Sequence, residues 1–206
     1  MMNPYQLYLV TDDQQDLETL KHVVAEAIKG GVTMVQVREK HGDVRAFIER
    51  AQAVKAILQG TGVPLIINDR VDVALAVDAD GVHLGQSDMP ADLARQLIGD
   101  QKILGLSVEN EQQLFDAEAM PVDYLGLSAI FTTPTKTDIK KAWGIDGLAQ
   151  AVAKSTFPIV AIGGINMSNI ADIHAAGADG IALVSAICHA ESPAQAARDC
   201  LAALQA

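Results

Sequence analysis

Basic residues are few in this sequence. Its 206 residues include 15 Lys and Arg against 26 Asp and Glu, so the formal net charge is -11 and the sequence pI is about 4.7. Nucleic acids and anionic membranes attract proteins through basic surfaces, and this balance therefore argues against both as partners. Any anionic ligand must be held by a few locally placed cations, which makes the positions of Lys and Arg informative.

Cysteine is also scarce, and segments that direct export or membrane insertion are missing. Cys188 and Cys200 lie twelve residues apart and fit no metal-binding or redox spacing, so we expect buried or half-buried thiols in a reducing cytosol. Residues 1–5 include neither the charged region nor the apolar region of a signal peptide. No apolar run approaches the length of a membrane span. These absences predict a cytoplasmic protein.

Two kinds of segment alternate along the whole sequence. Short runs rich in Val, Ile and Leu are typical of strands buried on both faces, and Ala-rich amphipathic stretches between them are typical of helices. Strands are expected at Gln6–Val10, Thr33–Val37, Leu65–Asn68, Gly81–Leu84, Ile103–Leu106, Tyr124–Leu127, Ile159–Ile162 and Gly180–Val184. Helices are expected at Leu17–Lys29, Asp43–Gln59, Val71–Val77, Ala91–Ile98, Glu111–Ala119, Ile145–Lys154, Met167–Ala175 and Pro193–Leu204.

This alternation predicts an α/β fold with a parallel sheet. No linker or low-complexity stretch divides the chain, so we expect one domain over residues 1–206, a (β/α)8 TIM barrel. The alternative is an open doubly wound sheet, which would need a glycine-rich phosphate-binding turn after the first strand, where this chain has Val10-Thr11-Asp12-Asp13. Asp80, Asp123 and Asp179 each precede a strand of similar length, which indicates repeated quarters of a barrel.

The second predicted strand ends in a group of charged and polar residues. Active sites of such barrels lie at the carboxyl ends of the strands, so the residues there decide function. Strand alternation directs Gln36, Arg38 and Lys40 to one side and Val37 and Glu39 to the other. Two cations and an amide at one strand end suit a pyrophosphate. The alternative is a solvated charge cluster in which Glu39 neutralises the cations.

Carboxylates follow the third and fourth predicted strands. Asp69 and Asp88 are expected to lie beside each other, close to the cations of the second strand. Mg2+ in proteins is typically held by one or two carboxylates together with substrate phosphates. The pair therefore predicts a site for a metal and a diphosphate. The alternative is that each carboxylate caps the helix that follows it.

The fifth and sixth strand ends provide hydroxyl groups and another cation. Ser107 is expected to be either a helix N-cap or a hydroxyl ligand. The long segment 128–144 contains Thr133, Thr135 and Lys136, which are able to surround a phosphate and place a cation beside a leaving group. The alternative for that segment is a flexible polar loop without a ligand.

Glycines and a serine follow the last two predicted strands. Gly163 and Gly164 would let backbone amides approach a ligand, and Ser185 starts a short helix. Phosphate sites recur between the last two loops of such barrels, so we expect a phosphate monoester there. His83 is expected to face the barrel interior, either as a packed, hydrogen-bonded side chain or in proton transfer. Trp143 is more typical of packing than of ligand stacking.

Taken together, these segments resemble the thiamine-phosphate synthase family over essentially the whole chain. Each segment alone is a modest signal, and their occurrence in order at successive strand ends makes the resemblance specific. The segments are Gln36-Val37-Arg38-Glu39-Lys40, Ile67-Asn68-Asp69-Arg70, Gly81-Val82-His83-Leu84-Gly85-Gln86 with Asp88, Thr133-Pro134-Thr135-Lys136, Ile162-Gly163-Gly164-Ile165 and Val184-Ser185-Ala186-Ile187.

The resemblance implies a (β/α)8 barrel and a transferase that joins two small-molecule substrates with Mg2+ as cofactor. Hydroxymethylpyrimidine diphosphate and a thiazole phosphate would give thiamine monophosphate and pyrophosphate by dissociative substitution. Asp69 and Asp88 would be the metal ligands, and Arg38, Ser107 and Lys136 the catalytic residues. The substrate-binding residues implied are Gln36, Val37, Arg38, Glu39, Lys40, Asn68, Ser107, Thr133, Pro134, Thr135, Lys136, Gly164, Val184 and Ser185.

Two departures from the family pattern and two rival functions accompany this expectation. Where the family often has Gly-Pro before the sixth loop, this chain has Ser128-Ala129, and Glu109 stands where a His is common. A related barrel isomerase, a thiazole tautomerase, would need a phosphate site and a histidine-type base but no site for a metal and a diphosphate. A phosphate-binding sensor would bind its ligand without turnover. A homo-oligomer is left open.

Overall fold

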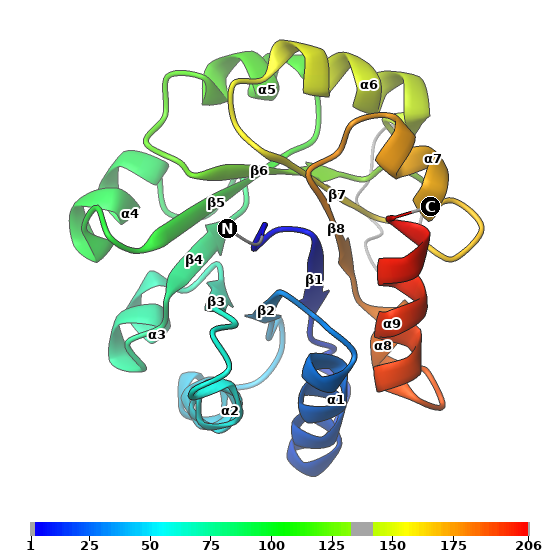
Figure 1. Ribbon diagram of the computed structural model, residues 1–206. Coiled ribbons are helices and arrows are strands. Elements are labelled where there is room, and N and C mark those ends of the chain that lie inside the picture. Colours follow the sequence, from blue (N-terminus) through cyan, green and yellow to red (C-terminus); the bar gives the residue numbers. More distant parts are fainter. Residues whose placement is uncertain (1–2, 133–141, 206) are drawn as a thin grey trace.

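A computed structural model describes residues 3–132 and 142–205 of the chain. Within this part, parallel strands close into a barrel in the order β1-β2-β3-β4-β5-β6-β7-β8, each paired with its neighbours along the chain and β8 paired with β1 (Figure 1). The predicted (β/α)8 barrel is thereby confirmed. The strands are β1 (Leu7–Val10), β2 (Met34–Val37), β3 (Leu65–Asn68), β4 (Gly81–Leu84), β5 (Ile103–Val108), β6 (Tyr124–Ser128), β7 (Ile159–Ile162) and β8 (Gly180–Leu183).

Helices surround the barrel on its outer face (Figure 1). They are α1 (Leu17–Lys29), α2 (Val44–Leu58), α3 (Val71–Ala76), α4 (Ala91–Ile98), α5 (Glu111–Ala117), α6 (Gly144–Lys154), α7 (Ile170–Ala175), α8 (Ser185–Cys188) and α9 (Pro193–Ala203). The expected elements are found, with ends that differ by a few residues. β5 extends to Val108, and α7 begins at Ile170 instead of Met167 because the Asn169 side chain closes a turn on the backbone N–H of Asn166 at 2.9 Å.

Helix starts follow from side-chain oxygens that accept orphan backbone N–H groups. Asp16 accepts from the Thr19 N–H at 2.7 Å, and Asp43 accepts from the Ala46 N–H at 2.9 Å. Asn110 closes the start of α5 in the same way at 3.0 Å. These caps explain why α1, α2 and α5 begin where the polar residue precedes the amphipathic run.

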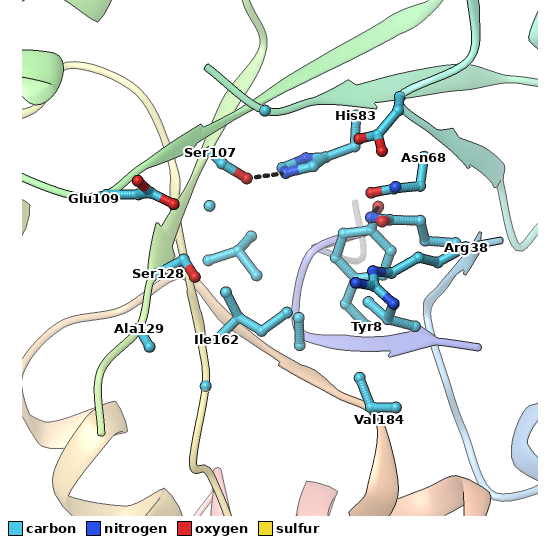
Figure 2. Close-up of a pocket in the computed structure, with 18 of the residues that line it drawn as sticks. Tyr8, Arg38, Asn68, His83, Ser107, Glu109, Ser128, Ala129, Ile162 and Val184 are labelled. Atoms are coloured by element: carbon cyan, nitrogen blue, oxygen red, sulfur yellow. Dashed lines mark hydrogen bonds between the residues drawn. The ribbon is translucent and has the colours of Figure 1, made fainter. Parts of the chain in front are cut away.

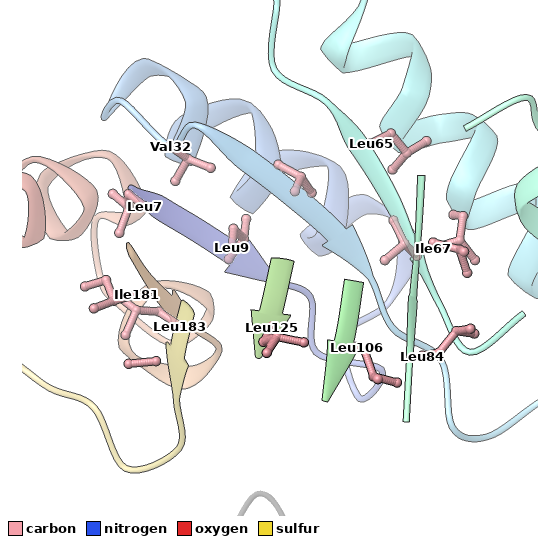
Figure 3. Close-up of a cluster of buried hydrophobic side chains, with 14 of the residues drawn as sticks. Leu7, Leu9, Val32, Leu65, Ile67, Leu84, Leu106, Leu125, Ile181 and Leu183 are labelled. Atoms are coloured by element: carbon pink, nitrogen blue, oxygen red, sulfur yellow. The ribbon is translucent and has the colours of Figure 1, made fainter. Parts of the chain in front are cut away.

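The strands are buried on both faces, as their continuous apolar sequences predict. Outward-facing side chains such as Leu7, Leu9 and Ile67 pack between the barrel and its helices (Figure 3). Inward-facing side chains such as Tyr8 and Ile66 form a second, smaller cluster inside the barrel. The two-residue alternation of each strand therefore separates a structural face from a face that lines the barrel interior, where a site can form.

Within the described residues, four equivalent hydrogen-bonded contacts, which we call strand clips, join neighbouring strands near their amino ends. In three of them Asp80, Asp123 and Asp179 accept from the backbone N–H of Leu65, Leu104 and Ile159 at 2.8, 2.7 and 2.8 Å. Each of these aspartates also donates its own backbone N–H to the carbonyl oxygen of the same partner residue. Thr33 closes the fourth clip, because its hydroxyl accepts from the Leu7 N–H at 2.9 Å and its N–H donates to the Leu7 carbonyl.

The strand clips lie between β1 and β2, β3 and β4, β5 and β6, and β7 and β8. The repetition inferred from the three aspartates is therefore a repetition of strand pairs, and it includes a fourth member that the sequence did not reveal because threonine replaces aspartate. Among residues 3–132 and 142–205, no helix is both long enough and apolar enough to cross a lipid bilayer.

Both cysteine thiols are free and buried, as the sequence analysis expected. Burial raises the pKa of Cys188 to about 12 and that of Cys200 to about 11. Because the thiolate is the reactive form, both thiols of the folded protein should react with a disulfide reagent at pH 8 at least roughly 100-fold more slowly than in urea. Absorbance of the released thiolate measures both rates. Equal rates in the two conditions would contradict the burial.

Candidate active site

A cavity of about 470 Å3 opens at the carboxyl ends of the strands. Residues from all eight strands or the segments directly after them line it, and Figure 2 shows side chains from several strands converging on one space. The described site residues proposed from strand ends are accordingly brought together, with the exceptions given below. Thr133, Pro134, Thr135 and Lys136 lie outside the described residues.

The end of β2 presents its cations to the cavity. Gln36, Arg38 and Lys40 line the cavity, as alternation predicts. The backbone N–H of Arg38 donates to the Thr11 hydroxyl at 3.0 Å, and that of Lys40 donates to the Asp13 carboxylate at 3.0 Å. The segment after β1 therefore supports the cation-bearing strand, a role that the sequence analysis did not assign to Thr11 or Asp13.

The side chains of Val37 and Glu39 point away from the cavity. Val37 belongs to the core between barrel and helices, and Glu39 accepts from Arg50 Nε at 2.6 Å. Burial raises the pKa of the Glu39 carboxyl, an effect that the hydrogen bond from Arg50 opposes. Strand alternation turns both side chains outward, as the sequence analysis expects, and neither residue is among those that line the cavity. Their place among the substrate-binding residues, which the resemblance implies, stays a prediction. Glu39 is thus paired with Arg50, not with the cations of its own strand.

Asp69 and Asp88 lie beside each other at the ends of β3 and β4. Lys40 Nζ donates to Asp69 Oδ2, and Asp88 Oδ2 accepts from the Gly85 N–H at 2.7 Å. Burial raises the pKa of Asp88, and the neighbouring Asp69 raises it further. The alternative reading as helix caps is wrong for both, because α3 and α4 have no side-chain cap and begin after Arg70 and Pro90.

This carboxylate pair suits a hard divalent cation. Within the described ranges no three His, Cys, Asp or Glu side chains converge as a complete metal cage. Mg2+ does not require one, since it usually takes one or two carboxylates and fills its octahedron with water and substrate phosphates. The pKa of Asp88 is raised by burial and then by Asp69, and a bound cation would offset both effects because it stabilises the ionised carboxylates.

The opposite wall of the cavity is formed by the ends of β7 and β8. Gly163 and Gly164 have φ values of 100° and 68°, and Val184 and Ser185 follow β8. A Cβ on Gly163 would lie 2.5 Å from Ala129 Cβ, and one on Gly164 would lie 2.7 Å from Phe131 Cβ. The glycines are therefore needed for the close approach of the segment after β6, in addition to any approach of a ligand.

That segment is held to β7 beyond the strand ends. The Ile130 N–H donates to the Ile162 carbonyl and the Phe131 N–H to the Gly163 carbonyl, both at 3.0 Å. On the return side, the Trp143 N–H donates to the Ala129 carbonyl at 3.0 Å. Trp143 packs against the apolar core, which confirms the packing expectation for this residue.

Asn68, His83 and Ser107, from β3, β4 and β5, also line the cavity (Figure 2). Asn68 is 7% exposed, and its Nδ2 has no hydrogen-bond partner within the described part of the chain. His83 Nε2 lies 2.9 Å from Ser107 Oγ, and His83 Nδ1 lies 2.8 Å from the Tyr124 hydroxyl. Ser107 is not a helix cap, because Asn110 caps α5, and Ser107 lines the cavity.

Comparison with known families decides the class of enzyme. The family model described as thiamine monophosphate synthase matches residues 7–187. The chain belongs to the thiamine monophosphate synthase family. The family resemblance stated from the strand-end segments is thereby confirmed, and this thiamine monophosphate synthase family member is an enzyme of thiamine biosynthesis, a transferase that acts on small molecules.

The sequences of individual relatives align with this family member over almost the whole chain. The thiamine-phosphate synthase of Vibrio parahaemolyticus serotype O3:K6 is 74% identical over 196 residues, 95% of this chain and 96% of that protein. The thiamine-phosphate synthase of Methanobrevibacter smithii is 45% identical over 195 residues, 95% of this chain and 93% of that protein. Among solved structures, a thiamine phosphate pyrophosphorylase from Pyrococcus furiosus superposes with a TM-score of 0.88 at 36% identity, covering 98% of this chain and 96% of that one.

Proposed function

We propose that this family member, acting as a single domain over residues 1–206, joins hydroxymethylpyrimidine diphosphate to a thiazole phosphate and releases pyrophosphate. The observation that carries the proposal is the division of one cavity into two parts with different chemistry. Asp69, Asp88 and the cations of β2 form one part, and the backbone turns after β7 and β8 form the other. Two anion-binding parts in one cavity suit a reaction that joins two phosphate-bearing molecules.

The diphosphate half uses charge and hydrogen-bond donors of the chain. Arg38 and Lys40 would bind the diphosphate oxygens, and Lys136 would add a cation beside the leaving group. Asn68 Nδ2, buried without a partner among the described residues, is a donor ready for a substrate oxygen or ring nitrogen. Asp69 and Asp88 would hold Mg2+, which when bound neutralises charge on the diphosphate.

The bond changes are those of a dissociative substitution. The bond between the pyrimidine methylene carbon and the diphosphate oxygen breaks, and both of its electrons leave with pyrophosphate. The amino-pyrimidine ring delocalises the positive charge that remains, and the thiazole nitrogen lone pair forms the new carbon–nitrogen bond. Arg38, Ser107 and Lys136 would stabilise the charge that grows on the leaving group, so positioning and fixed charge supply most of the catalysis.

The thiazole phosphate would bind on the opposite wall. Gly164, Val184 and Ser185 bring backbone N–H groups and a hydroxyl to the cavity, and Thr133, Pro134 and Thr135 would complete this half. With its phosphate held on this wall, the thiazole would direct its ring nitrogen toward the methylene carbon of the pyrimidine held on the other.

The test mixes both substrates with the purified protein, with Mg2+ and separately with EDTA. We expect thiamine monophosphate and pyrophosphate in equal amounts with Mg2+ and loss of product with EDTA. Isomerisation of the thiazole phosphate without formation of thiamine monophosphate, and without a need for Mg2+, would instead support the tautomerase. Ligand binding without any turnover would support the sensor, and either result would contradict the proposal.

A further inference from the structure

A continuous line of hydrogen bonds crosses the barrel interior between residues that line the cavity. Gln36 Nε2 donates to the Tyr8 hydroxyl at 2.7 Å, and the Tyr8 and Tyr124 hydroxyls lie 2.9 Å apart. From Tyr124 the line continues through His83 to Ser107, with distances of 2.8 and 2.9 Å. We call these five side chains the interior chain. Figure 2 shows its last hydrogen bond, between His83 and Ser107, as a dashed line.

The fold makes room for the interior chain with glycines. A Cβ on Gly105 would overlap the Tyr124 ring and lie 2.5 Å from His83 Nδ1. A Cβ on Gly126 would lie 3.0 Å from His83 Cε1. Glycine inside a strand usually marks a close approach of other groups. Two such glycines on neighbouring strands indicate that the His83 and Tyr124 positions are built into the barrel.

Each hydroxyl in the line has one proton to donate. Burial raises the pKa of both Tyr8 and Tyr124, so both phenols stay neutral. Because Tyr8 accepts from Gln36, its proton is available for Tyr124, and the Tyr124 proton is then available for His83 Nδ1. In a neutral imidazole the other nitrogen carries the proton, so His83 Nε2 donates to Ser107.

If the hydroxyl protons of Tyr8 and Tyr124 pointed the opposite way along the interior chain, one buried donor would be left without an acceptor. Tyr8 would accept from both Gln36 and Tyr124, and its own proton would lack an acceptor among the described residues, although Tyr8 is only 1% exposed. A buried donor without an acceptor is costly. The forward direction leaves every hydroxyl proton of the interior chain with an acceptor, except that of Ser107, which lines the cavity.

We propose that the interior chain fixes His83 as the Nε2–H tautomer and thereby makes Ser107 a hydrogen-bond donor into the cavity, with Tyr8, Tyr124 and His83 as positioning residues. This inference rests on the proposed function, in which Ser107 stabilises the charge on the leaving diphosphate. It also takes Gln36, which lines the same cavity, as the substrate-binding residue that the family resemblance implies. A diphosphate oxygen only accepts hydrogen bonds, so it requires Ser107 as a donor. Because the Gln36 amide nitrogen donates to Tyr8, the Gln36 side-chain oxygen remains free to accept from a substrate N–H. The interior chain thus links a contact to one end of the pyrimidine diphosphate with a contact to the other.

The tautomer is measured directly by 15N NMR of histidine-labelled protein, with and without Mg2+ and pyrophosphate. The signals of His83 are assigned by their loss in His83→Gln. We expect a protonated Nε2 and an unprotonated Nδ1 in both states. A protonated Nδ1, alone or together with Nε2, would overturn the proposal, and this readout does not depend on turnover.

The coupling between the two ends is measured by a double-mutant cycle in kcat/KM for the pyrimidine diphosphate. The factor by which Ser107→Ala lowers kcat/KM should be at least about threefold smaller when Gln36→Ala is present, because the interior chain then no longer orients the Ser107 hydroxyl. In a Tyr124→Phe background the two losses should multiply. Tyr5→Phe is the matched control, since the Tyr5 ring lies 4.9 Å from that of Tyr124 but is not part of the interior chain, and the coupling should persist there.

Losses that multiply already in the wild-type background, or coupling that survives Tyr124→Phe, would overturn the inference. Thermal melting of each variant accompanies the cycle, so that only folded variants enter the comparison. If the wild-type protein forms no thiamine monophosphate at all, the proposed function fails, and that outcome is distinct from active enzyme without coupling.

Discussion

Asp69→Asn is expected to lower kcat/KM for the pyrimidine diphosphate by at least about 100-fold, because in the proposed function Asp69 is a charged ligand of Mg2+ whose loss would cost several kcal/mol in the transition state. Asparagine is the suitable replacement because Asp69 has a φ of 62°, a conformation that asparagine tolerates better than alanine. The melting temperature should change little. The concentration of Mg2+ that gives half-maximal rate should rise.

Asp72→Asn is the matched control for this variant. Asp72 lies three residues further on, is largely exposed, and pairs with Arg70 at 2.6 Å outside the cavity. An exposed pair of this kind contributes little, so activity should stay within about twofold of wild type. Normal turnover of Asp69→Asn, or an equal loss in Asp72→Asn, would remove Asp69 from the proposed metal site.

Gly105→Ala is expected to lower the free energy of unfolding by about 2–3 kcal/mol, because the new methyl group would overlap the Tyr124 ring inside a packed barrel. The displaced Tyr124 and His83 should also weaken the position of Ser107, so kcat should fall in the protein that remains folded. Urea unfolding followed by circular dichroism measures the first effect, and turnover at a temperature well below the melting point measures the second.

Gly147→Ala makes the same substitution at a position without overlap, and it is expected to raise the stability. Gly147 lies within α6, where an added Cβ would meet Trp143 at ordinary contact distances of 3.4 Å. Alanine is favoured over glycine in a helix, so this variant should be more stable by roughly 0.5–1 kcal/mol. If both variants change stability alike, the overlap at Gly105 is not the cause of its loss.

The barrel and most of its rim were predictable because both depend on local pattern. Continuous apolar strands and amphipathic helices predict the alternation, and closure brings successive strand ends together whatever the loop sequences are. For that reason Arg38, Asp69 and Ser185 could be placed at one cavity without knowledge of any contact. The same two-residue period predicts that Val37 and Glu39 point outward, and they do.

The interior chain could not be predicted in the same way. Tyr8 and Tyr124 occupy ordinary strand positions, where aromatic residues are common for reasons of packing alone. Their hydroxyl contacts depend on which inward-facing residues share a level of the barrel, and this depends on strand register. Gly105 and Gly126 were the available signal, since glycine in the middle of an apolar strand indicates that another group comes close.

The four strand clips divide the barrel into pairs of strands. They bind strands within the pairs β1–β2, β3–β4, β5–β6 and β7–β8, so the molecule consists of four modules of the same design. Circular permutants cut at a module boundary would keep every clip, whereas cuts inside a module would separate clipped strands in the chain. Successive duplication of one two-strand segment would leave this fourfold pattern behind.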